Sequence, residues 1–382
     1  MNRLYIHKTF LSSLSVALIL CSCNTPMNFP SSEVHVKFPN TELESSSVLS
    51  KQEFVKLESS NQSAIIGGIN RLLCSDSLMF IVDKANNKIA SFDYRGQFVA
   101  STLSLIGHAR NEYVHLLDAA IDLQNKQIYV YCDIPSQVLI LDYDLRVKES
   151  IKMNDLILEI AVDSEYMYAL CPNLTDETKY DIRCYKKDNL VGRPDILIVQ
   201  NRAIPKVEGW GKVLNKCGEY IFTCLPFDNT IYKICCGKVI NSWHVDFGDR
   251  WFDYSECKHL RGTGFLSANE EKHWIIQNIV SSKKEMIFNT NQTNTFKISI
   301  STNEGTGFLR FRNKFIPFSN SWFIPTSGVY DVAFSIPSSQ IVDYRDYYIR
   351  RNKTMPDNSI NSIIQTVSKE DNPLIVLGNI IK

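Results

Sequence analysis

The chain has 382 residues, and its 41 Lys and Arg residues balance 41 Asp and Glu residues, so the formal net charge is zero. Hydrophobic residues make up 44%, enough for a large core, and the charged fraction of 21% is too low for a disordered chain. A neutral chain without basic runs is not expected to bind nucleic acid, which requires clustered Lys and Arg. The length allows two or three domains, although repeat and barrel folds reach this size as one unit.

The N-terminus has the features of an export signal. Arg3 and Lys8 precede an apolar run of residues 10–20 that is too short to span a membrane. The run ends in Leu20-Cys21-Ser22-Cys23, which resembles a bacterial lipobox with a small residue before the acceptor cysteine. We therefore expect residues 1–22 to form a lipoprotein signal peptide and Cys23 to carry the lipid. The alternative is an ordinary cleaved signal with two incidental cysteines.

Residues 23–50 are rich in Ser, Pro, Asn and Thr and show little apolar periodicity. This composition predicts a flexible tether, which would leave residues 51–382 as the folded domain. With its N-terminal lipid inserted, the exported protein would be an outer-membrane lipoprotein. The segment after Cys23 lacks an acidic run, and both the periplasmic and the surface face of that membrane stay open.

Nine cysteines follow Cys23, in a compartment where disulfides can form. No Cys or His spacing is typical of a zinc site, so we predict no metal and no cofactor. Most of these cysteines lie in apolar, strand-like runs, which favours small buried side chains. A structural disulfide is the alternative, although the neighbours Cys235 and Cys236 would be strained if they bridged each other.

A pattern of short apolar strands and tight turns repeats through residues 78–142. Two apolar runs, 78–83 and 89–93, are separated by the turn 84–88, and the same order returns at 128–133 and 138–142. Weaker copies begin at Met167, Tyr220, Trp274 and Trp322. With the first two copies anchored at residues 79 and 128, the anchors are 49, 39, 53, 54 and 48 residues apart. Such a period of about 40–50 residues is typical of the blades of a β-propeller.

The six anchors predict an all-β, six-bladed β-propeller. Propellers are commonly closed by pairing the two ends of the chain within one blade, and residues 53–57 and 373–377 supply suitable strands. A β-sandwich or another all-β array is the alternative. Apolar residues in segment 339–368 have near-helical spacing, with Asn358 or Ser359 as a cap, which predicts a short helical insertion in the last blade.

These segments resemble the six-bladed, NHL-repeat-like propeller lipoproteins of Bacteroides and related bacteria. The resemblance covers residues 50–382 and rests on five features: the lipobox, the segment IVDKANNKIASFDYRGQF at 81–98, the Gly-rich loop 107–113, DNTIYKI with VDFG at 228–248, and DNPLIVL at 371–377. Ala109 and Asn111 depart from the small or Pro residues expected in the loop. The resemblance implies a fold and a cell-envelope location but no activity.

No constellation typical of catalysis is present. The most polar cluster, His108 with Arg110 and Glu112, is a candidate ligand-binding rim or else a solvated loop. Trp210 and Trp251 lie in loop-like sequence and are candidates for an exposed aromatic platform. The aspartates that end the repeated strands are better explained as turn residues than as acid/base pairs.

We therefore expect a membrane-anchored binding or interaction module without evident catalysis. Its partner would be a glycan, a peptide or another protein, such as one of the outer membrane. The alternative is a propeller enzyme of the lyase or lactonase kind, with a cation held in the central channel. A cluster of three or more Asp, Glu or His side chains in that channel would favour the enzyme.

Overall fold

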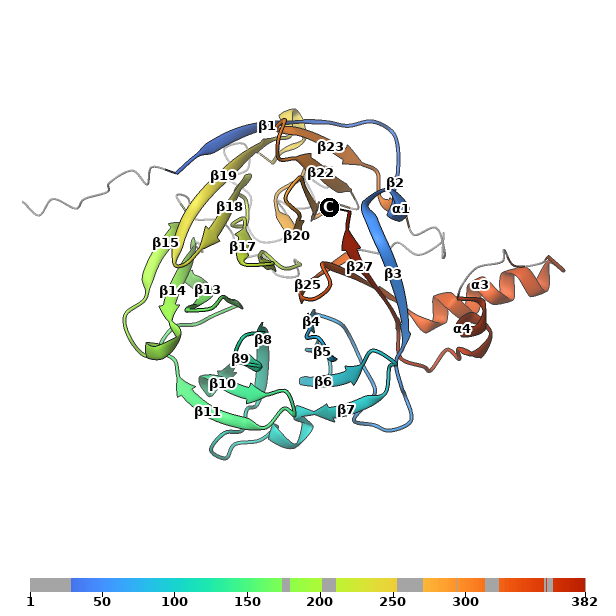
Figure 1. Cartoon of the computed structure of the whole chain (residues 1–382), viewed down its shortest axis with the longest axis horizontal. Helices are drawn as coiled ribbons and strands as arrows, with labels where there is room; N and C mark the ends of the chain where they lie inside the picture. Colours follow the sequence, from blue (N-terminus) through green and yellow to red (C-terminus); the bar gives the residue numbers. More distant parts are fainter. Residues whose placement is uncertain are drawn as a thin grey trace, which may run out of the picture.

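The computed structural model describes residues 29–173, 179–200, 211–252, 271–292, 294–312, 323–353, 355 and 360–381. In this part of the chain, antiparallel four-stranded units follow one another around a ring, which is the architecture of a β-propeller (Figure 1). The first strand of each unit lies toward the centre of the ring, and first strands of neighbouring units contact each other. The expected all-β propeller class is therefore confirmed.

The units are described by their strands in chain order. The first two contain β4 (Arg71–Cys74), β5 (Leu78–Asp83), β6 (Lys88–Asp93) and β7 (Phe98–Ser101), then β8 (His115–Asp122), β9 (Gln127–Ile134), β10 (Ser136–Asp142) and β11 (Val147–Lys152). The next two contain β12 (Glu159–Val162), β13 (Tyr166–Asn173), β14 (Lys179–Lys186) and β15 (Asp195–Val199), then β16 (Leu214–Cys217), β17 (Tyr220–Thr223), β18 (Thr230–Cys235) and β19 (Lys238–Asp246). After these come β20 (Ile276–Ser281), β21 (Glu285–Thr290), β22 (Thr295–Ser299) and β23 (Glu304–Phe308), the short β24 (Phe311–Arg312), and finally β25 (Phe323–Gly328), β26 (Val332–Ile336) and β27 (Leu374–Ile380). Short 3-10 helices occur at η1 (Thr102–Leu105), η2 (Lys187–Asn189) and η3 (Gly248–Arg250).

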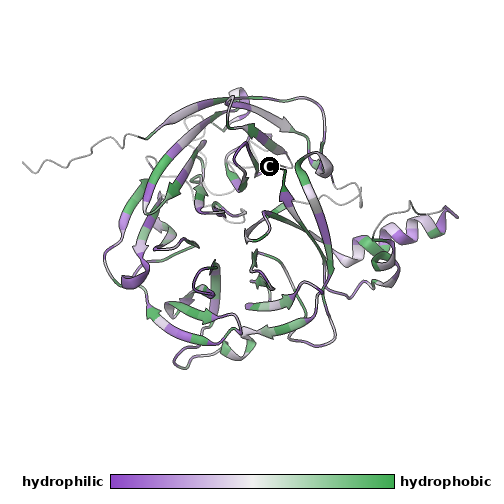
Figure 2. Ribbon diagram, in the orientation of Figure 1, coloured by the Kyte–Doolittle hydropathy of each residue, from purple (hydrophilic) through white to green (hydrophobic). Residues whose placement is uncertain are grey.

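Burial follows the position of a strand within its unit. Every residue of the inner strands β4 and β12 is buried, because neighbouring units cover both faces. Every residue of the outer strand β11 keeps some exposure. In Figure 2 hydrophilic and hydrophobic residues accordingly alternate along the outer strands of the ring. The continuous apolar runs in the sequence thus correspond to inner strands, as expected.

A strand near the start of the described chain pairs with the last strand. β3 (Leu49–Lys56) runs antiparallel to β27, with Phe54 opposite Val376, and adds a fourth strand to the β25–β27 unit. On its other side, β25 pairs in parallel with β4, so this unit is joined directly to the β4–β7 unit. The pairing expected between segments 53–57 and 373–377 is present.

Order begins earlier than residue 51. β1 (Ser31–Lys37) lies parallel to both β19 and β23 and so inserts between the outer strands of two units. The short β2 (Leu43–Glu44) pairs with β24, and α1 (Ser45–Val48) leads into β3. Figure 1 shows this segment following the circumference of the ring. We call residues 31–48 the strap. The expected tether to residue 50 therefore gives way to ordered structure at residue 31, because backbone hydrogen bonds from two outer strands hold this polar segment.

The fifth repeat anchor, unlike the first four, does not lie on the second strand of its unit. Met79, Ile128, Met167 and Tyr220 lie on the second strands of their units, whereas Trp274 precedes β20, which is a first strand. Trp322 lies outside the described residues. The repeat pattern was assigned to the wrong strand here because a first strand that is covered on both faces is as continuously apolar as a second strand.

Helices interrupt the last unit between β26 and β27. α3 (Ser338–Arg350) and α4 (Asn361–Thr366) lie on the flank of the ring and contact each other (Figure 1). α3 begins one residue before the predicted helical insertion 339–368 and α4 lies within it, while the proposed caps Asn358 and Ser359 lie outside the described residues. Ile341 of α3 and Ile364 of α4 are fully buried in one hydrophobic cluster with β26 and β27.

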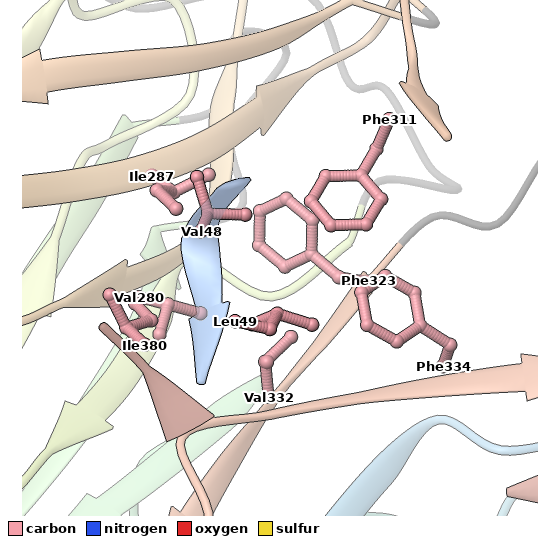
Figure 3. A pocket seen from close by; sticks show the side chains of 9 residues that line it. All are labelled: Val48, Leu49, Val280, Ile287, Phe311, Phe323, Val332, Phe334 and Ile380. Carbon is pink, nitrogen blue, oxygen red and sulfur yellow. The ribbon is translucent and has the colours of Figure 1, made fainter. Parts of the chain in front are cut away.

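Apolar side chains fill the space between the β20–β23 unit and the β25–β27 unit. Figure 3 shows nine of them converging, among them Phe311, Phe323 and Phe334. The space left between them is only about 10 Å³, too little for an organic ligand. This region is therefore packed core and not a binding site.

The described cysteines behave largely as expected. All eight are free, and Cys74, Cys132, Cys171, Cys184 and Cys224 are buried. Within the described part of the chain, no helix has both the length and the apolar character needed to cross a membrane.

Candidate functional site

A cluster of four charged side chains, three of them buried and the fourth partly buried, occupies the centre of the ring. Arg71 at the start of β4 donates to both carboxylate oxygens of Asp118 on β8, at 3.0 and 2.8 Å. Lys212, just before β16, lies 2.9 Å from Asp118. Glu159 at the start of β12 lies 3.7 Å from Arg71. We call these four residues the central cluster. It joins the inner strands of four units with two positive and two negative charges.

Backbone groups complete the bonding of both carboxylates. Asp118 accepts the N–H of Ile160 at 2.9 Å, and Glu159 accepts the N–H groups of Val213 and Leu214 at 3.0 and 2.9 Å. Arg71 also donates to the carbonyl of Leu214 at 3.2 Å. The cluster therefore fixes the start of β16 against β4 and β12, and its polar atoms are engaged in holding strands together.

The two carboxyl groups of the central cluster have pKa values shifted in opposite directions. Burial raises the pKa of Asp118, but the positive charges of Arg71 and Lys212 outweigh it, and the pKa is lowered overall. For Glu159 burial has the largest effect, and its pKa is raised despite the same two cations. A buried acid paired with Arg and Lys and bonded to backbone amides is suited to structure rather than to proton transfer. Sequence reasoning missed this cluster.

The loop 107–113 does not bring its three candidate residues together. His108 and Arg110 are exposed, whereas Glu112 folds back and accepts the N–H of Ala109 at 2.8 Å. A side chain at Gly107 would collide with this carboxylate, since a Cβ there would lie 2.1 Å from Glu112 Oε2. The close approach explains the glycine at the start of the loop. His108 and Arg110 remain available for a ligand, and their role stays a prediction.

Trp251 is only partly exposed. Its ring stacks on Phe247, with centroids 4.9 Å apart, and packs at the edge of the cluster that contains Phe288 and Phe296. Trp210 lies outside the described residues. One face of the expected aromatic platform is therefore taken up by Phe247.

His273 is buried beside Trp251 in this aromatic cluster. Its Nδ1 lies 2.9 Å from the hydroxyl of Thr290, and its ring stacks on Phe38. Burial, together with the nearby charge of Arg250, lowers the pKa of His273 to about 4. The side chain is therefore neutral at neutral pH.

The strand-ending aspartates act in turns. Asp93 accepts the N–H groups of Arg95 and Gln97 at 2.9 and 2.8 Å. Asp142 accepts those of Asp144 and Arg146 at 3.1 and 2.9 Å. The interpretation of these repeated carboxylates as turn residues is confirmed for both positions.

Two adjoining polar hollows lie where first strands turn into second strands. One, of about 480 Å³, is lined by residues 122–124, 163–164, 216, 218–219 and 235–236. The other has the same volume, shares Ser164, and is lined by Tyr129, Tyr166 and residues 186–188. Between them, Lys187 bonds Asp122 and the carbonyls of Asp163 and Ser164. Volumes of this size suit small ligands.

The hollows and the sequence-predicted loops lie on opposite faces. The hollows are built from connections within units, from first to second and from third to fourth strands. Loop 107–113 and Trp251 lie in connections that lead from one unit to the next. In an antiparallel unit these two kinds of connection fall at opposite ends of the strands. The hollows carry no repeated sequence motif, which is why sequence reasoning missed them.

Residues 32–379 match the family described as a domain of unknown function, DUF4934. The chain belongs to this family. The DUF4934 chain is similar in structure to a Bacteroides fragilis protein described as exported, with 13% identity and a TM-score of 0.64 over 92% of this chain and 100% of that one. It also matches the WD40 repeats of RRP9 (10% identity, TM-score 0.43, 86% and 98% coverage) and BamB from Moraxella catarrhalis (8%, 0.40, 68% and 66%). No curated protein matches it significantly.

Asp118→Asn is expected to lower the free energy of unfolding by about 3–5 kcal/mol, because Arg71 and Lys212 would lose the charge that compensates them in the interior. Urea unfolding followed by circular dichroism measures the change. Asp144→Asn is the control: its ion pair with Arg146, at 3.5 Å, is mostly exposed and should contribute less than about 1 kcal/mol. Equal effects of the two variants would contradict the structural role of the central cluster.

Stability is also expected to fall as the pH drops from about 6.5 to 4. His273 has a lowered pKa in the folded state, so the unfolded chain binds the extra proton in this window and is favoured there. Above pH 6.5 the neutral His273 imposes no penalty on folding. At pH 5 the difference between its folded and unfolded pKa lowers the free energy of unfolding by about 2 kcal/mol. Unfolding free energies of the protein and of His273→Gln, measured at pH 7 and pH 5, test it. An undiminished pH dependence in the variant would refute the assignment.

Proposed function

We propose that this DUF4934 protein is an exported, lipid-anchored six-bladed β-propeller that acts as a binding or interaction module of the cell envelope. The export signal and the lipobox ending at Cys23 support the anchor and the location. The similar Bacteroides fragilis protein, described as exported, is consistent with that location.

The count of six blades rests on strand order. Units that begin with β4, β8, β12, β16 and β20 each contain four antiparallel strands, and β25, β26, β27 and β3 make up a further one. Pairing of β3 with β27 and of β25 with β4 supports a ring closed by both ends of the chain. Closure removes the free strand edges that would otherwise promote aggregation.

The central cluster is the observation that favours binding over catalysis. An enzyme of the lyase or lactonase kind would need free carboxylates or histidines near the axis to hold a cation. Asp118 and Glu159 instead lie with Arg71 and Lys212 and accept backbone N–H groups. Pairing with fixed cations makes these two acids poor cation ligands, and the enzyme alternative gains no support from them.

The two polar hollows are the best-formed recognition surface for such a module. Their linings combine carboxylates, amines, hydroxyls and tyrosine side chains, a set suited to a glycan or a polar peptide. Glu219 lines one hollow and Lys186 the other, and both are exposed, so they can contact a ligand with opposite charges. We place the ligand at this face.

A binding screen of the full chain against glycans and peptides tests the module. For the ligand that emerges, Glu219→Ala and Lys186→Ala are expected to weaken binding about ten-fold, as loss of a charged contact does. His108→Ala and Arg110→Ala, on the other face, should leave binding unchanged. The reverse result would indicate that the ligand binds at loop 107–113. Chemical conversion of the ligand would show that the protein is an enzyme and would contradict the proposed binding module.

Lipid attachment is tested separately in the bacterial host. Cys23→Ala should abolish incorporation of a radiolabelled fatty acid and release the protein from the membrane fraction, because the acyl chains supply the anchoring free energy. Cys21→Ala is the matched control and should leave labelling intact. Labelling lost only in Cys21→Ala would assign the lipid to the other cysteine.

A further inference from the structure

The pairing of the strap with the ring brings three metal-ligating side chains together on the outer surface. β1 and β19 run parallel with Glu33 opposite His244 and His35 opposite Asp246. Because residues two apart on a strand share a face, Glu33 and His35 project to the same side. One ligand atom from each of Glu33, His35 and Asp246 lies within 4.8 Å of the other two.

The distance between two of these ligand atoms is close to that between two ligands of one ion. His35 Nδ1 lies 2.9 Å from Asp246 Oδ2. Two ligands on one tetrahedral zinc, at about 2.0–2.2 Å from the metal, are separated by roughly 3.3 Å. Small side-chain rotations would therefore convert the present hydrogen bond into two bonds to a shared cation.

The carboxylate of Asp246 is held in position for this role. Its second oxygen, Oδ1, accepts the N–H of Gly248 at 2.8 Å, which leaves Oδ2 directed at His35. A fixed partner behind a ligand reduces the ordering needed when a metal binds. His35 and Asp246 keep 72% and 42% of their side-chain surface exposed, so an ion can reach them directly from solvent.

We propose that Glu33, His35 and Asp246 form a binding site for a divalent transition-metal ion of the zinc type, which clips the strap to the ring. One imidazole and two carboxylates suit zinc, whereas calcium and magnesium prefer oxygen ligands alone. His35 and Asp246 are 211 residues apart in the chain, so a shared ion links the strap, which lies within the predicted tether, to an outer strand. The site is independent of the proposed ligand-binding function. It was not predicted from the sequence because its ligands have no motif spacing.

Calorimetric titration of zinc chloride into the metal-free full chain tests the site. One ion per chain is expected, with affinity lowered at least ten-fold in His35→Gln and in Asp246→Asn. His35 is exposed and Asp246 partly so, and the side chain of Asp246→Asn keeps an oxygen that can accept the N–H of Gly248, so these variants should keep the thermal midpoint of the metal-free protein.

Two matched controls make the outcome specific. His244→Gln changes a histidine of the same strand that contacts Asn229 and Thr230, and it should alter the affinity less than three-fold. The double variant Cys235→Ser, Cys236→Ser removes the vicinal thiols and should have no effect. Absence of stoichiometric binding overturns the proposal, as does binding that is lost in either control while His35→Gln retains it.

Discussion

Charge balance in the centre of the ring is the constraint on which the arrangement of the inner strands depends. Asp118 is buried and lies with two cations, and removing either kind of charge would leave the other without compensation in a medium that solvates it poorly. The same groups bond the backbone at Ile160 and Leu214, so neutralisation and strand placement are one interaction. Apolar side chains in the centre could also pack these strands together, but apolar contacts lack the directional hydrogen bonds that set the position of each strand relative to its neighbours.

The fold was accessible from sequence where packing is local and two-sided. β5, β6, β9 and β10 are continuous apolar runs closed by turn aspartates, and their partners are neighbours along the chain. The strap was not accessible, because Val34 is the single buried side chain of its strand β1 and the partners of that strand follow more than 200 residues later. Nothing in a polar segment of this kind indicates which distant edges will accept it.

The residues of the candidate site likewise differ in how far they could be predicted, depending on whether their partners are near in sequence. Turn aspartates such as Asp93 were interpreted correctly because they bond backbone only a few residues away. The central cluster escaped notice because Arg71, Asp118 and Lys212 are far apart in sequence and only the curvature of the ring brings them together. Trp251 lies in irregular chain as expected, but its distance from Phe247 depends on side-chain packing that no local pattern encodes.

The strap has a geometric consequence for presentation at a surface. The chain enters the ring at its circumference, alongside β19, and not through either end of the axis (Figure 1). Attachment through the preceding residues would hold the disc-shaped propeller at its circumference. Neither flat side would then be pressed against the bilayer, and molecules could approach the protein from two directions at once.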